Sequence, residues 1–183
     1  MRHYNYTAHM YNLRYREEQN LKIKAAIENL EFNSQVSILD LGCGTGLLLS
    51  KIHEMAKMIV AIDMSKCMLK ETDPFVKRSR CIHFILADAD YIPLRNSYFD
   101  MVFAITLLQN MPNPHDTLQE VKRITKNDAL IIVTGLKNYF SEHSFVKLLK
   151  DADLKLKWLK TDDGLKCYIA TCRSKAPPVS NVQ

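Results

Sequence analysis

Three of the five glycines of this chain, Gly42, Gly44 and Gly46, fall within five residues and directly follow the apolar run 36–41. We predict that the run is a buried strand and that the glycines form a loop whose backbone N–H groups are not covered by side chains. A helix predicted over 47–58 would begin behind the loop and add partial positive charge there. These elements together predict a cradle for a small molecule, and a tight turn without a ligand is the alternative.

The spacing of the glycines indicates which kind of molecule the cradle holds. The segment 40–46 reads as an acid followed by G-x-G-x-G, whereas the dinucleotide fingerprint G-x-G-x-x-G would need a glycine at Leu47. This favours a ligand without a pyrophosphate. A nicotinamide-dependent oxidoreductase is the weaker alternative, because such enzymes often carry a Tyr-x3-Lys pair and no tyrosine here has a lysine four residues later.

A second carboxylate ends the next predicted strand, the apolar run 58–63. The carboxyl ends of neighbouring parallel strands lie side by side, so Asp63 is expected beside the glycine loop. Its two oxygens could then accept hydrogen bonds from two ribose hydroxyls. The alternative is that Asp63 only caps the helix predicted over 65–71, although Ser65 could cap that helix without it.

The segment Asp40-Leu41-Gly42-Cys43-Gly44-Thr45-Gly46 resembles motif I of the class I S-adenosylmethionine-dependent methyltransferases, with every element of the motif present. The resemblance covers roughly residues 4–173 and implies S-adenosylmethionine as the cofactor. From the compact architecture and the mild basic bias we expect the methyl acceptor to be a small molecule or RNA, with a protein acceptor ranked third. The cofactor-binding residues that the resemblance implies are Asp40, Gly42, Cys43, Gly44, Gly46, Asp63, Met64, Asp88, Ala89, Thr106, Leu107 and Tyr11.

Two later segments resemble further parts of this family. The predicted strand 82–89 carries Asp88, and the resemblance implies that this acid accepts a hydrogen bond from the adenine amine while the N–H of Ala89 contacts a ring nitrogen. Asp90 is a rival, because the register is open. The segment 105–112 resembles the loop that lines the methionine end of the cofactor, with Gln109 and Asn110 where many relatives have histidines.

Candidates for catalysis are weak, because an activated sulfonium methyl group requires mainly orientation of the acceptor and exclusion of water. Tyr4, Ala8, Tyr11 and Tyr15 match a pattern that covers the active site in many relatives, and their alternative role is packing. His143 lies early in the helix predicted over 141–152, and the alternative to a role in substrate handling is that it is simply an exposed helix residue. The candidates for substrate handling are Tyr11, Tyr15, Asn110 and His143.

The alternation of predicted helices and strands indicates an α/β fold: a doubly wound, mostly parallel seven-stranded sheet with helices on both faces and a C-terminal antiparallel hairpin. One methyltransferase domain is expected over 1–173, with a cover segment and helix over 1–31 and a disordered tail over 174–183. The predicted helices span 17–30, 47–58, 65–71, 115–124 and 141–152, and the predicted strands span 36–41, 58–63, 82–89, 98–104, 129–134, 154–159 and 166–172.

Composition narrows the setting of this domain. No apolar run approaches the roughly 18 residues of a membrane span, and the first residues lack the apolar core of a secretion signal. The five cysteines show no C-x-x-C pair, which predicts a reducing, cytoplasmic compartment without disulfides or a metal site.

The net charge of +5 includes lysines late in the chain, among them Lys155, Lys157 and Lys160. These side chains either meet RNA phosphates or protect an edge strand from aggregation. A non-catalytic, cofactor-binding partner subunit of a methyltransferase complex is the alternative to an enzyme.

Overall fold

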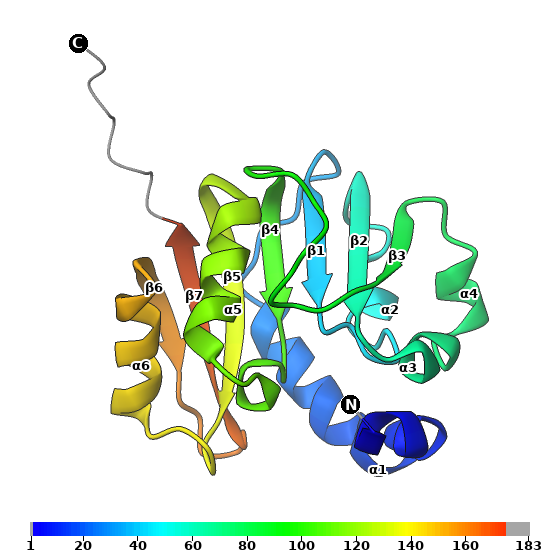
Figure 1. The fold of residues 1–183 in the computed structure, drawn as a ribbon, viewed down its shortest axis with the longest axis horizontal. Helices are drawn as coiled ribbons and strands as arrows, with labels where there is room; N and C mark the ends of the chain where they lie inside the picture. The colour runs from blue at the N-terminus through cyan, green and yellow to red at the C-terminus, as the bar shows by residue number, and fades with distance from the viewer. Residues whose placement is uncertain (1, 175–183) are drawn as a thin grey trace.

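The computed structural model describes residues 2–174, except for the side chains of residues 2–9, 11 and 12 (Figure 1). The helices are α1 (Arg2–Ile27), α2 (Leu49–Ile52), α3 (Lys66–Lys70), α4 (Pro74–Lys77), α5 (Pro114–Ile124) and α6 (Glu142–Asp151), with a 3-10 turn η1 (Leu108–Asn110). The strands are β1 (Ser37–Leu41), β2 (Met58–Asp63), β3 (Ile82–Leu86), β4 (Phe99–Ala104), β5 (Thr125–Leu136), β6 (Leu154–Lys160) and β7 (Cys167–Ser174).

The strands form one seven-stranded sheet in the order β3-β2-β1-β4-β5-β7-β6. Neighbouring strands from β3 to β5 pair in parallel, whereas β7 pairs antiparallel with both β5 and β6. The predicted fold class, including the C-terminal hairpin, is therefore confirmed. The chain order reverses between β1 and β4, and clefts for ligands form at such points in parallel sheets.

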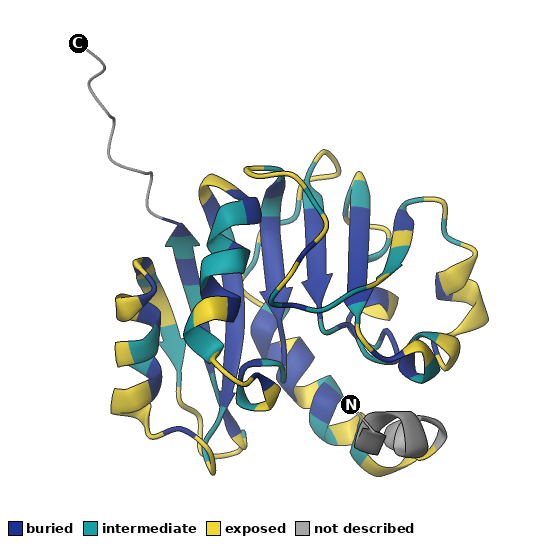
Figure 2. Cartoon of the chain, viewed as in Figure 1, coloured by how far each residue is buried: buried dark blue, intermediate teal, exposed yellow. Residues whose placement is uncertain are grey.

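Helices cover both faces of the sheet, and the strands between them are largely buried (Figure 2). Leu118 of α5 and Phe145 of α6 belong to one apolar core, on one face. Ile23 of α1, Leu49 of α2 and Val76 of α4 belong to the second core, on the other face. Strands buried on both faces explain why their sequences read as nearly continuous apolar runs.

Several boundaries differ from the sequence predictions. The helix predicted over 47–58 is wrong in length, because α2 has four residues and the chain then turns toward β2. The N–H of Lys57 donates to the carbonyl of Val36 at 3.0 Å, which draws the segment before β2 alongside β1. The short helix α4 was not predicted, although Asp73 accepts from the N–H of Phe75 and Pro74 occupies its first turn.

Both ends of the described chain also differ from prediction. The helix predicted from residue 17 is the last part of a longer helix, α1. Ser174 was assigned to the tail, but it is the last residue of β7 and is buried. Residues 175–183, the rest of the predicted tail, lie outside the described residues. No helix in the described part of the chain combines the length and the apolar character needed to cross a membrane.

The late lysines lie on and beside an edge of the sheet. Lys155 and Lys157 are exposed on β6, which is the last strand in the sheet order and has an irregular register between Leu156 and Trp158. Charged side chains and bulges both hinder pairing with a second chain. Lys160 forms an ion pair with Glu28, which directly follows α1. The position agrees with the edge-strand interpretation, and RNA contact stays a prediction.

Candidate functional site

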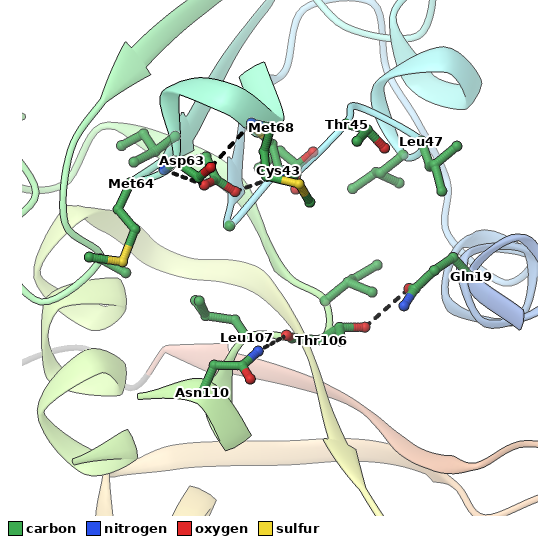
Figure 3. Close-up of a pocket in the computed structure, with 18 of the residues that line it drawn as sticks. Gln19, Cys43, Thr45, Leu47, Asp63, Met64, Met68, Thr106, Leu107 and Asn110 are labelled. Carbon is green, nitrogen blue, oxygen red and sulfur yellow. Dashed lines mark hydrogen bonds between the residues drawn. The ribbon is translucent and has the colours of Figure 1, made fainter. Parts of the chain in front are cut away.

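A cavity lies where the carboxyl ends of β1, β2, β3 and β4 meet α1 (Figure 3). Its position coincides with the reversal of strand order between β1 and β4. The residues that line it are Gln19, Ile23, Asp40, Gly42, Cys43, Gly44, Thr45, Leu47, Leu48, Ile62, Asp63, Met64, Ser65, Met68, Ala87, Asp88, Ala89, Ile105, Thr106, Leu107, Asn110 and Met111.

The glycine loop adopts a backbone that side chains rarely allow. Gly42, Gly44 and Gly46 have φ angles of +75°, +55° and +77°. A Cβ atom on Gly42 would lie 3.0 Å from the Leu107 side chain across the cavity wall. Gly46 does not line the cavity, and a Cβ atom there would lie 2.8 Å from Cγ2 of Thr72. Gly46 therefore permits close packing of the loop, whereas Gly42 and Gly44 keep the cavity floor free of side chains.

Asp63 links the glycine loop to the end of β2. Its Oδ2 accepts from the N–H of Gly44 at 2.8 Å, and its Oδ1 accepts from the N–H of Ser65 at 2.7 Å. The Ser65 hydroxyl in turn caps α3 by accepting from the N–H of Met68. Burial raises the pKa of Asp63, while backbone N–H groups oppose the rise. Each carboxylate oxygen can accept more than one bond, so this orientation leaves capacity for ligand hydroxyls.

Asp40 is the most deeply buried acid of the site, with 2% of its surface exposed. Its Oδ2 has no hydrogen-bond partner among the described residues. Burial raises the pKa of Asp40 to about 8, and the neighbouring Asp63 carboxylate adds to the rise. Buried polar atoms are nearly always hydrogen-bonded, so an unsatisfied oxygen in a cavity wall indicates a donor supplied by a ligand or by water.

The raised pKa of Asp40 makes the free energy of unfolding depend on pH. In the unfolded chain Asp40 ionises near pH 4, whereas in the folded protein it keeps its proton until about pH 8. The folded state therefore binds the extra proton, and stability falls as the pH rises through this window. Asparagine does not titrate. We expect Asp40→Asn to be more stable than the wild type at pH 9 by at least about 1.4 kcal/mol, the equivalent of one pKa unit.

Melting temperatures of the two proteins between pH 4 and pH 9 check this expectation. The two curves should approach each other at the acidic end and separate as the pH rises. A constant difference between them across the range would contradict the raised pKa.

The structure distinguishes the two acids that follow β3. Asp88 lines the cavity together with Ala89, and its Oδ1 accepts from the N–H of Asp90 at 3.1 Å. Asp90 does not line this cavity, and its carboxylate accepts a 2.5 Å hydrogen bond from the hydroxyl of Thr117 on α5. Asp88, and not its rival, therefore has the position suited to contact a ligand.

The loop after β4 closes the opposite side of the cavity. Thr106 has a φ angle of +59°, and its N–H donates to the hydroxyl of Thr134 at 2.7 Å. The amide nitrogen of Asn110 donates to the carbonyl of Thr106 at 2.8 Å. Leu107 lies between them in sequence and faces the glycine loop, while Met64 lines the cavity from the end of β2 (Figure 3).

A family model described as a methyltransferase domain matches residues 39–133, which is more than half of the chain. The chain belongs to this methyltransferase family. The matched region begins in β1 and ends in β5, so it contains the glycine loop, Asp63 at the end of β2 and Asp88 after β3.

Individual relatives agree with this assignment. This chain is 28% identical over 124 residues to a malonyl-[acyl-carrier protein] O-methyltransferase of Marinomonas sp. The match covers 67% of this chain and 46% of that one. It also resembles a solved S-adenosylmethionine-dependent methyltransferase of Aquifex aeolicus (TM-score 0.73, 18% identity, 83% of this chain and 89% of that one). A chain of the complex between the Haloferax volcanii Trm112 methyltransferase activator and a methyltransferase has a TM-score of 0.78 at 15% identity, covering 92% and 94%. The chain spans 46–64% of the length of three curated relatives that it matches.

The predicted catalytic candidates of the methyltransferase do not lie together. Asn110 lines the cavity. Tyr15 is half-buried beneath the guanidinium of Arg14, 5.3 Å from its ring centre, and does not line the cavity. His143 is exposed on α6 and also lies outside the cavity lining. The side chain of Tyr11, like those of Tyr4 and Ala8, lies outside the described part of the structure.

The cavity also argues against a cysteine nucleophile. Cys43 is buried, and burial raises its pKa well above its usual value, with Asp40 and Asp63 adding to the rise. A thiol kept protonated is a poor nucleophile, so a small side chain in the glycine loop is the better interpretation. The described residues contain no cluster of three histidine, cysteine, aspartate or glutamate side chains suited to a metal ion.

Two groups of cavity residues were missed by the sequence predictions. Gln19 and Ile23 come from α1, and Met68 comes from α3. The apolar spacing of α1 places Ile23 on the buried face. It does not indicate that this face meets the strand ends, which depends on how α1 packs in three dimensions.

Proposed function

We propose that this domain binds S-adenosylmethionine and transfers its methyl group to a small-molecule or RNA acceptor. The observation that carries the proposal is the convergence, on one cavity, of an uncovered glycine loop with strand-end acids from β1, β2 and β3. A molecule with an adenosine part and an amino-acid part matches this donor and acceptor set. Family membership and the solved S-adenosylmethionine-dependent neighbour support the proposal.

Each part of the cavity has a place in this proposal. Asp63 would accept hydrogen bonds from the ribose hydroxyls, and Asp88 with the N–H of Ala89 would bind the adenine edge. The unsatisfied Oδ2 of Asp40 and the loop at Gly42 fit the amino-acid part, which carries an ammonium group. The cofactor supplies an already activated methyl group.

The surrounding chain would then orient the acceptor and exclude water. Leu107, Asn110 and Met111 line the side of the cavity after β4 and would serve this purpose. The amide nitrogen of Asn110 donates to the carbonyl of Thr106, which fixes this side chain in place, and a carboxamide does not act as a base. This arrangement fits a transfer that depends on positioning more than on acid or base chemistry.

Calorimetric titration tests the cofactor. The purified protein is titrated with S-adenosylhomocysteine, the product form of the cofactor, and separately with NADH. We expect S-adenosylhomocysteine to bind at micromolar concentration or below and NADH to give no signal. Tight NADH binding without S-adenosylhomocysteine binding would instead favour the oxidoreductase alternative.

A labelled-methyl transfer assay tests the acceptor class. Fractionated cell extract is supplied with S-adenosylmethionine labelled in its methyl group, and parallel samples are treated with ribonuclease or protease. Label that remains in the small-molecule fraction after both treatments supports a metabolite, and label lost from the macromolecular fraction with ribonuclease supports RNA. Label released from that fraction only by protease would identify a protein acceptor and contradict the proposal.

A partner subunit is the second proposal, with an activator-dependent enzyme as one form and a non-catalytic cofactor-binding subunit as the other. The similarity to a chain of the complex that contains the Haloferax volcanii Trm112 methyltransferase activator favours it. If the protein binds S-adenosylhomocysteine but transfers label only in unfractionated extract, a required partner is supported. Transfer by the purified protein alone to an isolated acceptor would remove the need for a partner.

We also propose a reducing, cytoplasmic compartment, since all five cysteines are free thiols.

A further inference from the structure

Lys22 of α1 is one of the largest fully buried side chains, with 1% of its surface exposed. Its Nζ donates to Oγ1 of Thr106 at 2.9 Å and has a longer contact of 3.5 Å to Oε1 of Gln19. The carboxylate of Glu18 is 3.8 Å away and also accepts a 2.8 Å hydrogen bond from Lys166, which directly precedes β7. The ammonium group is therefore held mainly by two neutral oxygens.

Lys22 completes a triangle of polar side chains behind the cavity. The hydroxyl of Thr106 donates to Oε1 of Gln19 at 3.1 Å, so each corner of the triangle contacts the other two. Gln19 and Thr106 line the cavity, whereas Lys22 does not. Figure 3 shows Gln19 and Thr106 joined across the gap between α1 and the loop after β4, away from Asp63 and Met64.

The energetics indicate that this lysine is not retained for stability alone. Burying an ammonium group is costly when its ion pair with Glu18 is as long as 3.8 Å and that carboxylate also serves Lys166, and burial lowers the pKa of Lys22. A methionine would fill similar space without that cost. The same triangle holds Thr106 in a conformation with positive φ, which is unfavourable for a β-branched residue.

We propose that Lys22 is a positioning residue that fixes Gln19 and Thr106 as the cavity wall facing the amino-acid part of the cofactor. This inference rests on the proposed function. The adenosine part would lie at the other end of the cavity, near Asp63 and Asp88. Loss of Lys22 therefore weakens binding of ligands that carry the amino-acid part and spares ligands that lack it.

The test compares two ligands on matched variants by calorimetric titration. S-adenosylhomocysteine carries the amino-acid part, and 5′-methylthioadenosine lacks it. Lys22→Met removes the ammonium group with little change in volume, and Lys24→Met removes an exposed lysine from the same helix as a control. We expect Lys22→Met to raise the Kd of S-adenosylhomocysteine about tenfold and to leave that of 5′-methylthioadenosine within about twofold. Lys24→Met should change neither.

A second pair of variants keeps the test informative if Lys22→Met does not fold. Thr106→Ser retains the hydroxyl of the triangle, whereas Thr106→Val removes it and retains the shape. We expect the serine variant to bind both ligands like the wild type. The valine variant should show the selective loss for S-adenosylhomocysteine.

Three results would overturn the inference. Equal losses of affinity for both ligands would show a general structural role, and unchanged affinity for S-adenosylhomocysteine would show no role at all. If the wild-type protein binds neither ligand, the proposed function fails and this inference fails with it. The first two results leave the proposed function standing, so the two failures are distinguishable.

Discussion

Replacing Asp63 with asparagine weakens binding of S-adenosylhomocysteine about 100-fold in our expectation, or about 2.7 kcal/mol. Both carboxylate oxygens of Asp63 already accept backbone N–H groups, from Gly44 and Ser65. Asparagine has the same shape but has only one acceptor oxygen, so its NH2 group must face one of these N–H donors or turn toward the ribose. Hydrogen bonds to a charged group contribute about 1.5–3 kcal/mol, which sets the scale of the loss. Calorimetric titration measures it.

Asp73→Asn is the matched control. Asp73 accepts from the N–H of Phe75 at 2.7 Å in the same local pattern, but it is exposed at the start of α4 and does not line the cavity. Its replacement should leave the affinity for S-adenosylhomocysteine unchanged. Full affinity in Asp63→Asn would refute the assigned ribose contact, and equal losses in both variants would point to a general effect on folding.

Gly135→Ala is expected to reduce the free energy of unfolding by about 2–3 kcal/mol. Gly135 is buried in β5, and a Cβ atom there would lie 2.6 Å and 2.7 Å from two ring carbons of Phe145. The ring of Phe140 would be 3.0 Å away on the same side. Phe145 of α6 is itself fully buried, so its ring cannot move aside without disturbing the core between α6 and β5. Urea denaturation at equilibrium gives the free energy directly.

Gly164→Ala provides the comparison for this prediction. Gly164 is exposed in the turn between β6 and β7, and a Cβ atom there would meet only the side chain of Asp162 at 3.2 Å. That side chain is exposed, and its Oδ1 accepts from the N–H of Gly164 at 2.8 Å. A small shift of this exposed side chain relieves the contact, so the change should stay within about 0.5 kcal/mol. A Gly135→Ala protein as stable as Gly164→Ala would show that the core yields more readily than its packing indicates.

The sequence was sufficient to locate the strands of the sheet, because buried parallel strands appear as short apolar runs. Its bounds were wrong for β5, which is Thr125–Leu136 against the predicted 129–134, and for β3, which ends at Leu86 and not at 89. The run 58–63 matches β2 at both ends, and its terminal acid, Asp63, lies beside the glycine loop as predicted. The helix after the loop was overestimated, since residues 53–58 continue an acceptable helical pattern. Its end is set by the pairing of β2 with β1, including the bond from Lys57 to Val36, which a local pattern does not contain.

The site divides in the same way. The loop glycines and Asp63 follow from spacing, and Asp88 follows from the resemblance. The choice of Asp88 over Asp90 required the register, because Asp88 lines the cavity whereas Asp90 contacts Thr117. The resemblance implied that the N-terminal segment covers the site, but it pointed to Tyr11 and Tyr15 and not to Gln19 and Ile23. A lysine is rarely buried, so the sequence gives no reason to expect Lys22 inside the fold.

The cavity wall is assembled from segments between Gln19 and Met111 that are distant in the chain, including α1 and the turns after four different strands. A molecule bound there contacts segments on both sides of the point where the strand order reverses, so it holds these segments together. Its binding energy is therefore added to the resistance of the whole domain to heat and proteolysis, by about 2.7 kcal/mol at a concentration of 100 times Kd. Protection from melting can thus reveal a true acceptor among many metabolites even when the reaction it undergoes has no visible signal.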